Sequence, residues 1–137
     1  MSGRNEAKFE TLKYIDETGF ATGREIAEYR GVTHGAQSTL LKRYWGYGLL
    51  HRCSGEGKEK VYTLSQRGDE RLEWLEEQFE DMYFDFGPFR NLKRCRIKKN
   101  EESWSFLKNL ERCRVIHTDE DFIEIEQIPA SLKDSAH

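Results

Sequence analysis

The sequence lacks the features that mark a membrane-spanning or a secreted protein. It has no run of about 18 apolar residues, the length that a helix needs to cross a bilayer, and residues 1–10 hold no apolar signal region. Cysteine is also scarce, because Cys53, Cys95 and Cys113 are odd in number and widely spaced, which argues against a disulfide framework. We therefore expect a soluble protein in the reducing cytoplasm, with no membrane partner.

Motifs of catalysis and of metal binding are absent as well. The sequence contains no Gly-rich phosphate loop with Lys and Ser or Thr, no Ser nucleophile motif and no carboxylate pair singled out by apolar surroundings. Cys113 and His117 lie four residues apart, but no pair of ligands recurs with zinc-finger spacing. A metal or thiol sensor would have to recruit Cys53, Cys95, His51 and His137. We expect no enzyme, no cofactor and no metal, and we interpret the cysteines as small hydrophobic residues.

The chain as a whole has no excess of positive charge, since its net charge is -3. The charge is unevenly distributed: residues 1–67 hold 11 Lys or Arg against 8 Asp or Glu, residues 68–86 hold 1 against 8, and residues 87–137 hold 10 against 9. Nucleic-acid binding depends on the local patch that neutralises phosphates. The net charge therefore does not exclude it.

The most informative segment is 21–64, where two short helix patterns precede two strand patterns. Thr22 and Glu25 form a capping box, in which a hydroxyl and a carboxylate satisfy free amides at a helix start. Gly31 follows the first helix and allows a turn, because glycine adopts a positive φ without steric cost. A second helix is predicted over 33–45, with Thr33 as its cap.

Apolar residues recur in the second helix at steps of three and four. They are Ala36, Leu40, Leu41 and Tyr44. This register turns four polar side chains toward solvent: His34, Gln37, Ser38 and Lys42. Two strands are then predicted over 49–53 and 60–64, with the turn composition SGEGKE at 54–59 between them. The order predicts a helix-turn-helix followed by a β-hairpin wing with a basic tip.

This segment resembles the winged-helix family of DNA-binding regulators, of the broad type that includes the MarR and PadR groups. The resemblance rests on LKRYWGYGLLHR, at the end of the second helix, and on VYTLSQRGDERL, which leads from the wing into the next helix. It covers residues 8–80. The chain departs from the family pattern near Gln37, where a β-branched or aliphatic residue is usual. The resemblance implies an α+β fold and a bacterial or archaeal transcriptional regulator that binds double-stranded DNA sequence-specifically as a homodimer.

By this resemblance, helix 33–45 would enter the major groove and wing 54–59 would lie on the DNA backbone. The candidates for contact with base edges are His34, Gln37, Ser38 and Lys42, because amide and basic side chains recognise purine acceptors there. The candidates for phosphate contact are Thr22, Arg24, Arg43, Arg52, Lys58 and Lys60. Thr33, at the start of the helix, completes the set.

The acidic segment 68–86 is predicted to form a helix with one apolar stripe. The stripe consists of Leu72, Leu75, Phe79, Met82 and Phe86. Two heptads are too short to be stable alone, so the stripe packs either in the core of its own domain or against a second copy. A helix after the wing often forms the dimer interface in the regulators that the chain resembles, and we expect this here.

Gly87 and Pro88 end that helix and divide the chain into a winged helix-turn-helix domain with its trailing helix, residues 1–86, and a small α+β appendage, residues 87–137. Alternating apolar residues predict a β-α-β-β order for the appendage. Residues 90–99 carry six basic residues and no acid. This basic run either grips phosphate or offsets the acidic helix.

Two other functions stay open. Winged helices also serve as protein-protein interaction or scaffold modules of replication and transcription assemblies, since a fold alone does not assign a function. The basic run and Trp104 would also suit an appendage that binds RNA or single strands.

Overall fold

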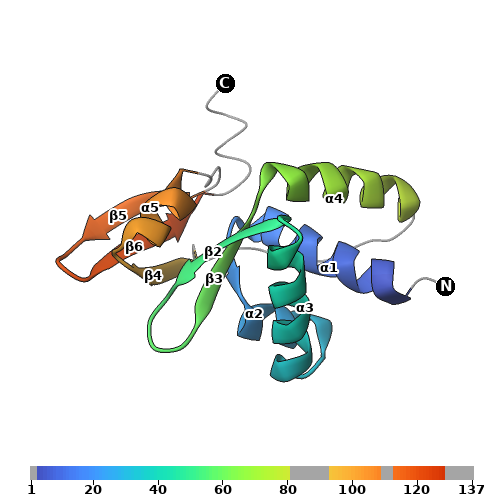
Figure 1. The fold of residues 1–137 in the computed structure, drawn as a ribbon, viewed down its shortest axis with the longest axis horizontal. Helices are drawn as coiled ribbons and strands as arrows, with labels where there is room; N and C mark the ends of the chain where they lie inside the picture. The colour runs from blue at the N-terminus through green and yellow to red at the C-terminus, as the bar shows by residue number, and fades with distance from the viewer. Residues whose placement is uncertain (1–2, 81–92, 109–112, 129–137) are drawn as a thin grey trace.

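The computed structural model describes residues 3–80, 93–108 and 113–128. In these ranges the chain forms helices and two three-stranded antiparallel sheets (Figure 1). The elements are, in chain order, α1 (Gly3–Thr18), β1 (Ala21–Thr22), α2 (Gly23–Arg30), α3 (His34–Gly46), β2 (Leu50–Ser54), β3 (Lys60–Leu64), α4 (Gln66–Gln78), β4 (Arg94–Lys98), α5 (Glu101–Leu107), β5 (Cys113–Thr118) and β6 (Phe122–Gln127).

The first sheet has the strand order β1-β3-β2 and belongs to the helix-turn-helix part of the chain. Strands β2 and β3 form the predicted hairpin, in which Arg52 lies opposite Tyr62. Strand β1 was not predicted, because two residues are too few to show a strand period. It pairs with β3 and so attaches the start of α2 to the wing.

The helix boundaries follow from local capping chemistry. The backbone N–H of Glu25 donates to Thr22 Oγ1 (3.3 Å) while that of Thr22 donates to Glu25 Oε1 (3.1 Å), which confirms the capping box. Gly31 ends α2 with φ of 70°. Thr33 Oγ1 accepts a hydrogen bond from the N–H of Ala36 (3.2 Å), so α3 begins after Thr33 as the pattern predicts.

The core of the first part is built from all four helices and the wing sheet. Its buried side chains include Leu12 of α1, Ile26 of α2 and Leu41 of α3. Helix α4 closes this core with Leu72 and Leu75, which are 3% and 0% exposed. Phe79 packs against the same core, and its ring stacks on that of Phe9 at a centroid distance of 5.2 Å.

These contacts bear on the predicted apolar stripe. Leu72 and Leu75 face their own domain, which is the first of the two alternatives that the sequence leaves open. Helix α4 ends at Gln78, earlier than the predicted helix over 68–86. Met82 and Phe86 lie outside the described residues. Leu72 and Leu75 are therefore too buried to form the predicted dimer interface with a second copy of the chain.

The appendage forms the predicted β-α-β-β unit, with strand order β4-β6-β5. Its apolar side chains share a second core with the first part of the chain. This core contains Phe20, Cys53 and Val61 together with Ile97, Phe106, Ile123 and Ile125. An isolated antiparallel bridge joins Gly55 of the wing to Ile97 of β4. The appendage thus packs directly on the wing.

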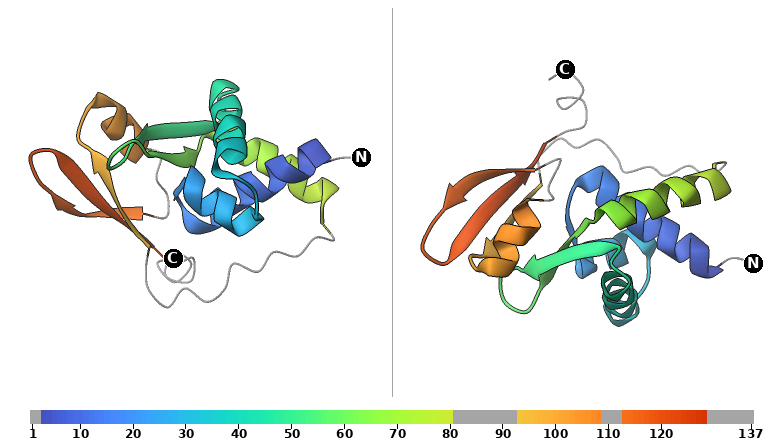
Figure 2. Two further views of the ribbon diagram at one scale, coloured as in Figure 1. Left: turned by 90° about the horizontal axis from the view of Figure 1, so that it is seen from below. Right: turned by 45° about the horizontal axis from the view of Figure 1, so that its top comes forward.

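The elements are arranged around this wing (Figure 1). Helix α3 and the turn of the hairpin project toward the lower side of the view, whereas α4 runs along the upper side. The appendage lies beyond the wing, at the end of the molecule away from the N-terminus, in all views (Figures 1 and 2). Among the described helices, none combines the length and the apolar character needed to cross a membrane.

Candidate nucleic-acid interface

A groove of about 390 Å³ lies where the start of α2, the exposed side of α3 and the wing hairpin meet. We call it the basic groove. Its lining residues are Thr22, Gly23, Arg24, His34, Ser38, Leu41, Lys42, Arg52, Lys58, Glu59, Lys60 and Tyr62. The fold thereby brings together most of the predicted contact residues, from three elements that are separate in the sequence.

Positive charge dominates the lining of the basic groove. The basic side chains are Arg24, Lys42, Arg52, Lys58 and Lys60, and the one carboxylate among the lining residues is Glu59. Arg24 Nε lies 3.7 Å from Glu59 Oε1, and both side chains are well exposed. Such an exposed pair holds its partners weakly. The groove is therefore a positively charged patch on a chain of net charge -3.

The start of α2 lies directly against α3. Gly23 is buried there, and a Cβ on it would come 3.3 Å from Leu41 Cδ1 and 3.5 Å from Ser38 Oγ. On the exposed side of α3, His34 Nε2 and Ser38 Oγ are 3.5 Å apart. One turn of α3 therefore presents a ring nitrogen and a hydroxyl to the groove.

Arg52 lies over the ring of Trp45. Its guanidinium carbon is 3.6 Å from the centroid of the indole ring, which is a close cation–π contact. Its Nε is buried and has no hydrogen-bond partner within the described residues. The sequence did not predict Trp45 as a platform for Arg52, because the contact joins the end of α3 to β2 across the fold.

Three of the predicted contact residues lie outside the lining of the groove: Thr33, Gln37 and Arg43. Thr33 is exposed, but its hydroxyl caps α3. Arg43 is exposed on α3, next in sequence to Lys42. Thr22 lines the groove and yet is 8% exposed, with its hydroxyl engaged in the capping box of α2. Thr22 is better described as a structural residue at the edge of the groove.

The prediction that Gln37 faces solvent is wrong. Gln37 is fully buried, where its Oε1 accepts a hydrogen bond from Arg30 Nη1 (2.6 Å) and its Nε2 donates to Thr11 Oγ1 (3.1 Å). Arg30 Nε in turn donates to Glu10 Oε1 at 3.2 Å. Gln37 therefore joins α1, α2 and α3 from the inside.

Two arginines of the basic run at 90–99, Arg94 and Arg96, form ion pairs within the appendage and with the wing. Arg94 Nε donates to Glu126 Oε2 (2.8 Å), and Arg114 Nη2 donates to Glu126 Oε1 (2.6 Å). Arg96 pairs with Asp119 and with Glu56. The two arginines beside it hold the pKa of the Glu126 carboxyl below its usual value. Arg90 lies outside the described residues.

The three cysteines pack as the small hydrophobic residues that the sequence suggests. Cys53 is fully buried in the second core, and Cys95 and Cys113 pack against it. Burial raises the pKa of Cys95 to about 11 and that of Cys113 to about 12. Both thiols are therefore protonated at neutral pH, where the thiolate is the reactive form.

We expect these thiols to react slowly with a disulfide reagent. In the native protein at pH 8, labelling of Cys95 and Cys113 should be at least about tenfold slower than in the same protein unfolded in guanidinium, since little thiolate is present. Absorbance of the released thiolate reports the rate. Equal rates in the native and unfolded protein would show that the thiols are open and ionised.

The wing and helices are similar to those of solved proteins. The transcriptional regulator BldR from Sulfolobus solfataricus matches with a TM-score of 0.50 at 18% identity, over 56% of this chain and 55% of BldR. A mutant MarR from E. coli, complexed with operator DNA, matches with a TM-score of 0.48 at 23% identity, over 52% of each chain. YusO from Bacillus subtilis gives a TM-score of 0.48 at 18% identity, over 56% of this chain and 62% of that protein.

The chain spans little more than half the length of these solved structures. No protein-family model matches its sequence, and no curated protein matches it either. At this level of identity the likeness to BldR concerns the fold, and it agrees with the element order and the wing hairpin described above. The protein therefore has the winged helix-turn-helix fold, to which a β-α-β-β appendage is added.

Proposed function

We propose that the protein binds double-stranded DNA through the basic groove and regulates transcription. The observation that carries this proposal is the convergence of five basic side chains from α2, α3 and the wing beside the exposed side of α3, in a chain that is negative overall. Phosphate neutralisation by such a local patch supplies most of the affinity of a protein for duplex DNA.

Each wall of the groove has its own role in this proposal. Helix α3 enters the major groove, with His34, Ser38 and Lys42 toward base edges. Arg24 and Arg52, together with Lys58 and Lys60 of the wing, contact phosphates. Thr33 and Arg43 lie at the margin of this surface. Gln37 takes no part, since it is buried.

Two further observations support the proposal. The acidic helix α4 lies on the side of the molecule opposite α3 and the wing turn, so its carboxylates are kept away from a bound duplex (Figure 1). BldR, whose fold the chain resembles, is a transcriptional regulator, and we extend regulation to this chain on that likeness.

Fluorescence anisotropy on mixed-sequence duplexes tests the proposal. We expect binding at low salt, and a Lys58→Ala, Lys60→Ala variant should bind more weakly and lower the dependence of log K on log salt by about 2, one for each lost phosphate contact. A matched variant, Lys98→Ala with Lys108→Ala, removes two exposed lysines of the appendage and should bind like the wild type. No binding at low salt, or equal losses in the two variants, would refute it.

Dimerisation is part of the proposal, as expected from the resemblance. With Leu72 and Leu75 engaged in their own core, the exposed Trp74 of α4 is a candidate for such an interface. A dimer should bind two half-sites about 34–36 Å apart, one DNA turn. Sedimentation equilibrium of the full chain measures the oligomeric state, and a monomer at all concentrations would refute dimerisation.

A second candidate function is a protein-protein interaction module. Trp74 and Trp104 are 44% and 50% exposed, and α4 presents acidic residues around Trp74. Exposed aromatic side chains are enriched in protein interfaces. A folded protein that fails to bind any duplex at low salt would favour this candidate over DNA binding.

A further inference from the structure

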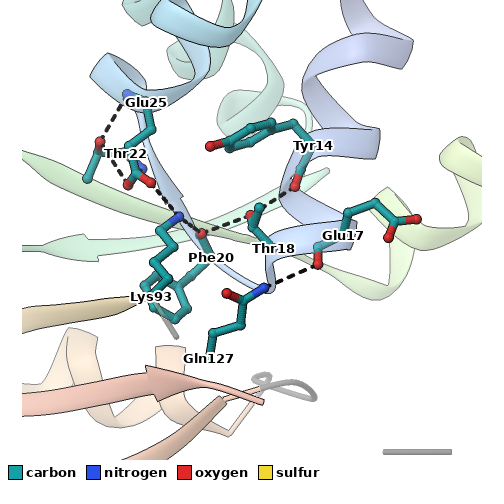
Figure 3. A network of polar contacts seen from close by, with 8 residues as sticks. All are labelled: Tyr14, Glu17, Thr18, Phe20, Thr22, Glu25, Lys93 and Gln127. Carbon is teal, nitrogen blue, oxygen red and sulfur yellow. Dashed lines mark hydrogen bonds and ion pairs between the residues drawn. The ribbon is translucent and has the colours of Figure 1, made fainter. Parts of the chain in front are cut away.

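A lysine of the appendage reaches into the helix-turn-helix. Lys93 Nζ lies 2.7 Å from Glu25 Oε2 and also donates a hydrogen bond to the carbonyl oxygen of Phe20 (Figure 3). Its side chain is only 16% exposed. The residue that directly precedes β4 is thus anchored at the start of α2.

The carboxylate that holds Lys93 is the one that caps α2. Glu25 Oε1 accepts hydrogen bonds from the backbone N–H of Thr22 (3.1 Å) and from its hydroxyl (3.2 Å), while Oε2 faces Lys93 (Figure 3). The two oxygens therefore divide their bonds between the first turn of α2 and the appendage. That first turn carries Gly23 and Arg24 into the wall of the basic groove.

The surroundings of Lys93 make its charge costly unless it is paired. The ammonium lies over the rings of Phe20 and Tyr14, at 4.7 Å and 5.8 Å from their centroids. Burial lowers the pKa of Lys93, and the Glu25 carboxylate acts in the opposite direction. Removing one partner of such a buried pair leaves the charge of the other partner without a counter-charge. The pair therefore favours this particular placement of the appendage against α2.

The appendage also holds the opposite wall of the groove, the wing. Gly55 bridges to Ile97, and Cys53 and Val61 are buried against appendage side chains. At the turn of the hairpin, Arg96 Nη1 lies 3.8 Å from Glu56 Oε2. The start of α2 and the hairpin are thus both fastened to the same unit.

We propose that the appendage sets the geometry of the basic groove, and that Lys93 is a positioning residue that holds the first turn of α2 and Arg24 in place for DNA phosphate. This inference rests on the proposed function. Lys93 does not itself contact DNA, because its charge is directed inward to Glu25. Helix α3 is held by the core of the first part, so the contribution of Lys42 is independent of Lys93.

The first test is the affinity of Lys93→Met for duplex DNA. We expect it to fall about 5- to 10-fold at one salt concentration, as for coupled neighbours, with the thermal melt confirming a folded protein. Lys93→Arg, which keeps a cation for Glu25, should recover most of the affinity. Lys108→Met, an exposed lysine in the same appendage, is the matched control and should bind like the wild type.

A double-mutant cycle separates positioning from general loss of structure. Arg24→Ala should weaken DNA binding about fivefold in the wild type and less than about twofold in the Lys93→Met background. The reason is that a misplaced Arg24 already contributes little to the affinity. Lys42→Ala should cost the same in both backgrounds. Additive effects of Arg24→Ala and Lys93→Met would overturn the inference.

A measurement without DNA distinguishes failure of this inference from failure of the proposed function. In Lys93→Met, amide hydrogen exchange should accelerate at residues 22–26 at the start of α2 and stay unchanged in the second half of α3. Unchanged exchange at 22–26 would overturn the positioning role whether or not the protein binds DNA. Accelerated exchange in a protein that binds no duplex would overturn the proposed function and, with it, the role of Lys93 in DNA binding.

Discussion

Reversing one charge in the basic groove, by Lys42→Glu, is expected to weaken binding of duplex DNA by about 30-fold or more. Lys42 lies on the exposed side of α3 and lines the groove together with Arg52 and Lys60. The substitution removes a contact of about 1–3 kcal/mol and adds repulsion between a carboxylate and the DNA backbone. Anisotropy titrations at two salt concentrations measure both the loss and its salt dependence.

The matched control lies on the same helix. Arg43 is exposed on α3 but does not line the groove. Arg43→Glu therefore reverses one positive charge, as Lys42→Glu does, at a position outside the groove. We expect a loss several-fold smaller than that of Lys42→Glu. Equal losses would mean that binding reports only the net charge of α3, which contradicts a groove-specific interface.

The second large effect concerns stability: Gly68→Ala should destabilise the fold by about 3 kcal/mol, near the upper end for overpacking. Gly68 is buried in the first turn of α4, and a Cβ there would lie 2.1 Å from the carbonyl oxygen of Leu49. The Leu49 oxygen is a backbone atom and also accepts a hydrogen bond from the N–H of Ser65 at 3.0 Å, so it cannot easily move away. Thermal unfolding should show a midpoint lower by about 10 °C.

Another helical glycine provides the control. At Gly35, in the first turn of α3, a Cβ would meet nothing within 4 Å. Gly35→Ala should therefore leave stability unchanged or raise it by up to about 1 kcal/mol, the difference in helix propensity. A Gly68→Ala variant as stable as Gly35→Ala would show that the start of α4 is free to move away from Leu49.

The parts of the fold that the sequence predicts are those determined by neighbouring residues. The cap at Thr22, the turn at Gly31 and the wing hairpin all depend on contacts within a few positions, and they are confirmed. The β-α-β-β order of the appendage also depends on local patterns of apolar residues, and it is confirmed too.

The predictions that failed or lacked detail depend on distant contacts. The apolar register of the helix places Gln37 toward solvent, but in the structure Arg30 and Thr11 satisfy its amide in the interior. Lys93 was assigned to a basic run, and its partner Glu25 is remote in the sequence. The boundary predicted between residues 86 and 87 lies outside the described residues and stays a prediction.

Binding of DNA through the basic groove can be tested by a titration of the isotope-labelled protein with a short duplex, in which amide chemical shifts are measured. We expect the largest shifts at the start of α2 (22–24), on the exposed side of α3 (34, 38 and 42) and in the wing (52 and 58–60), with α4 (66–78) unaffected. Shifts concentrated on α4, or no shifts at low salt, would contradict it.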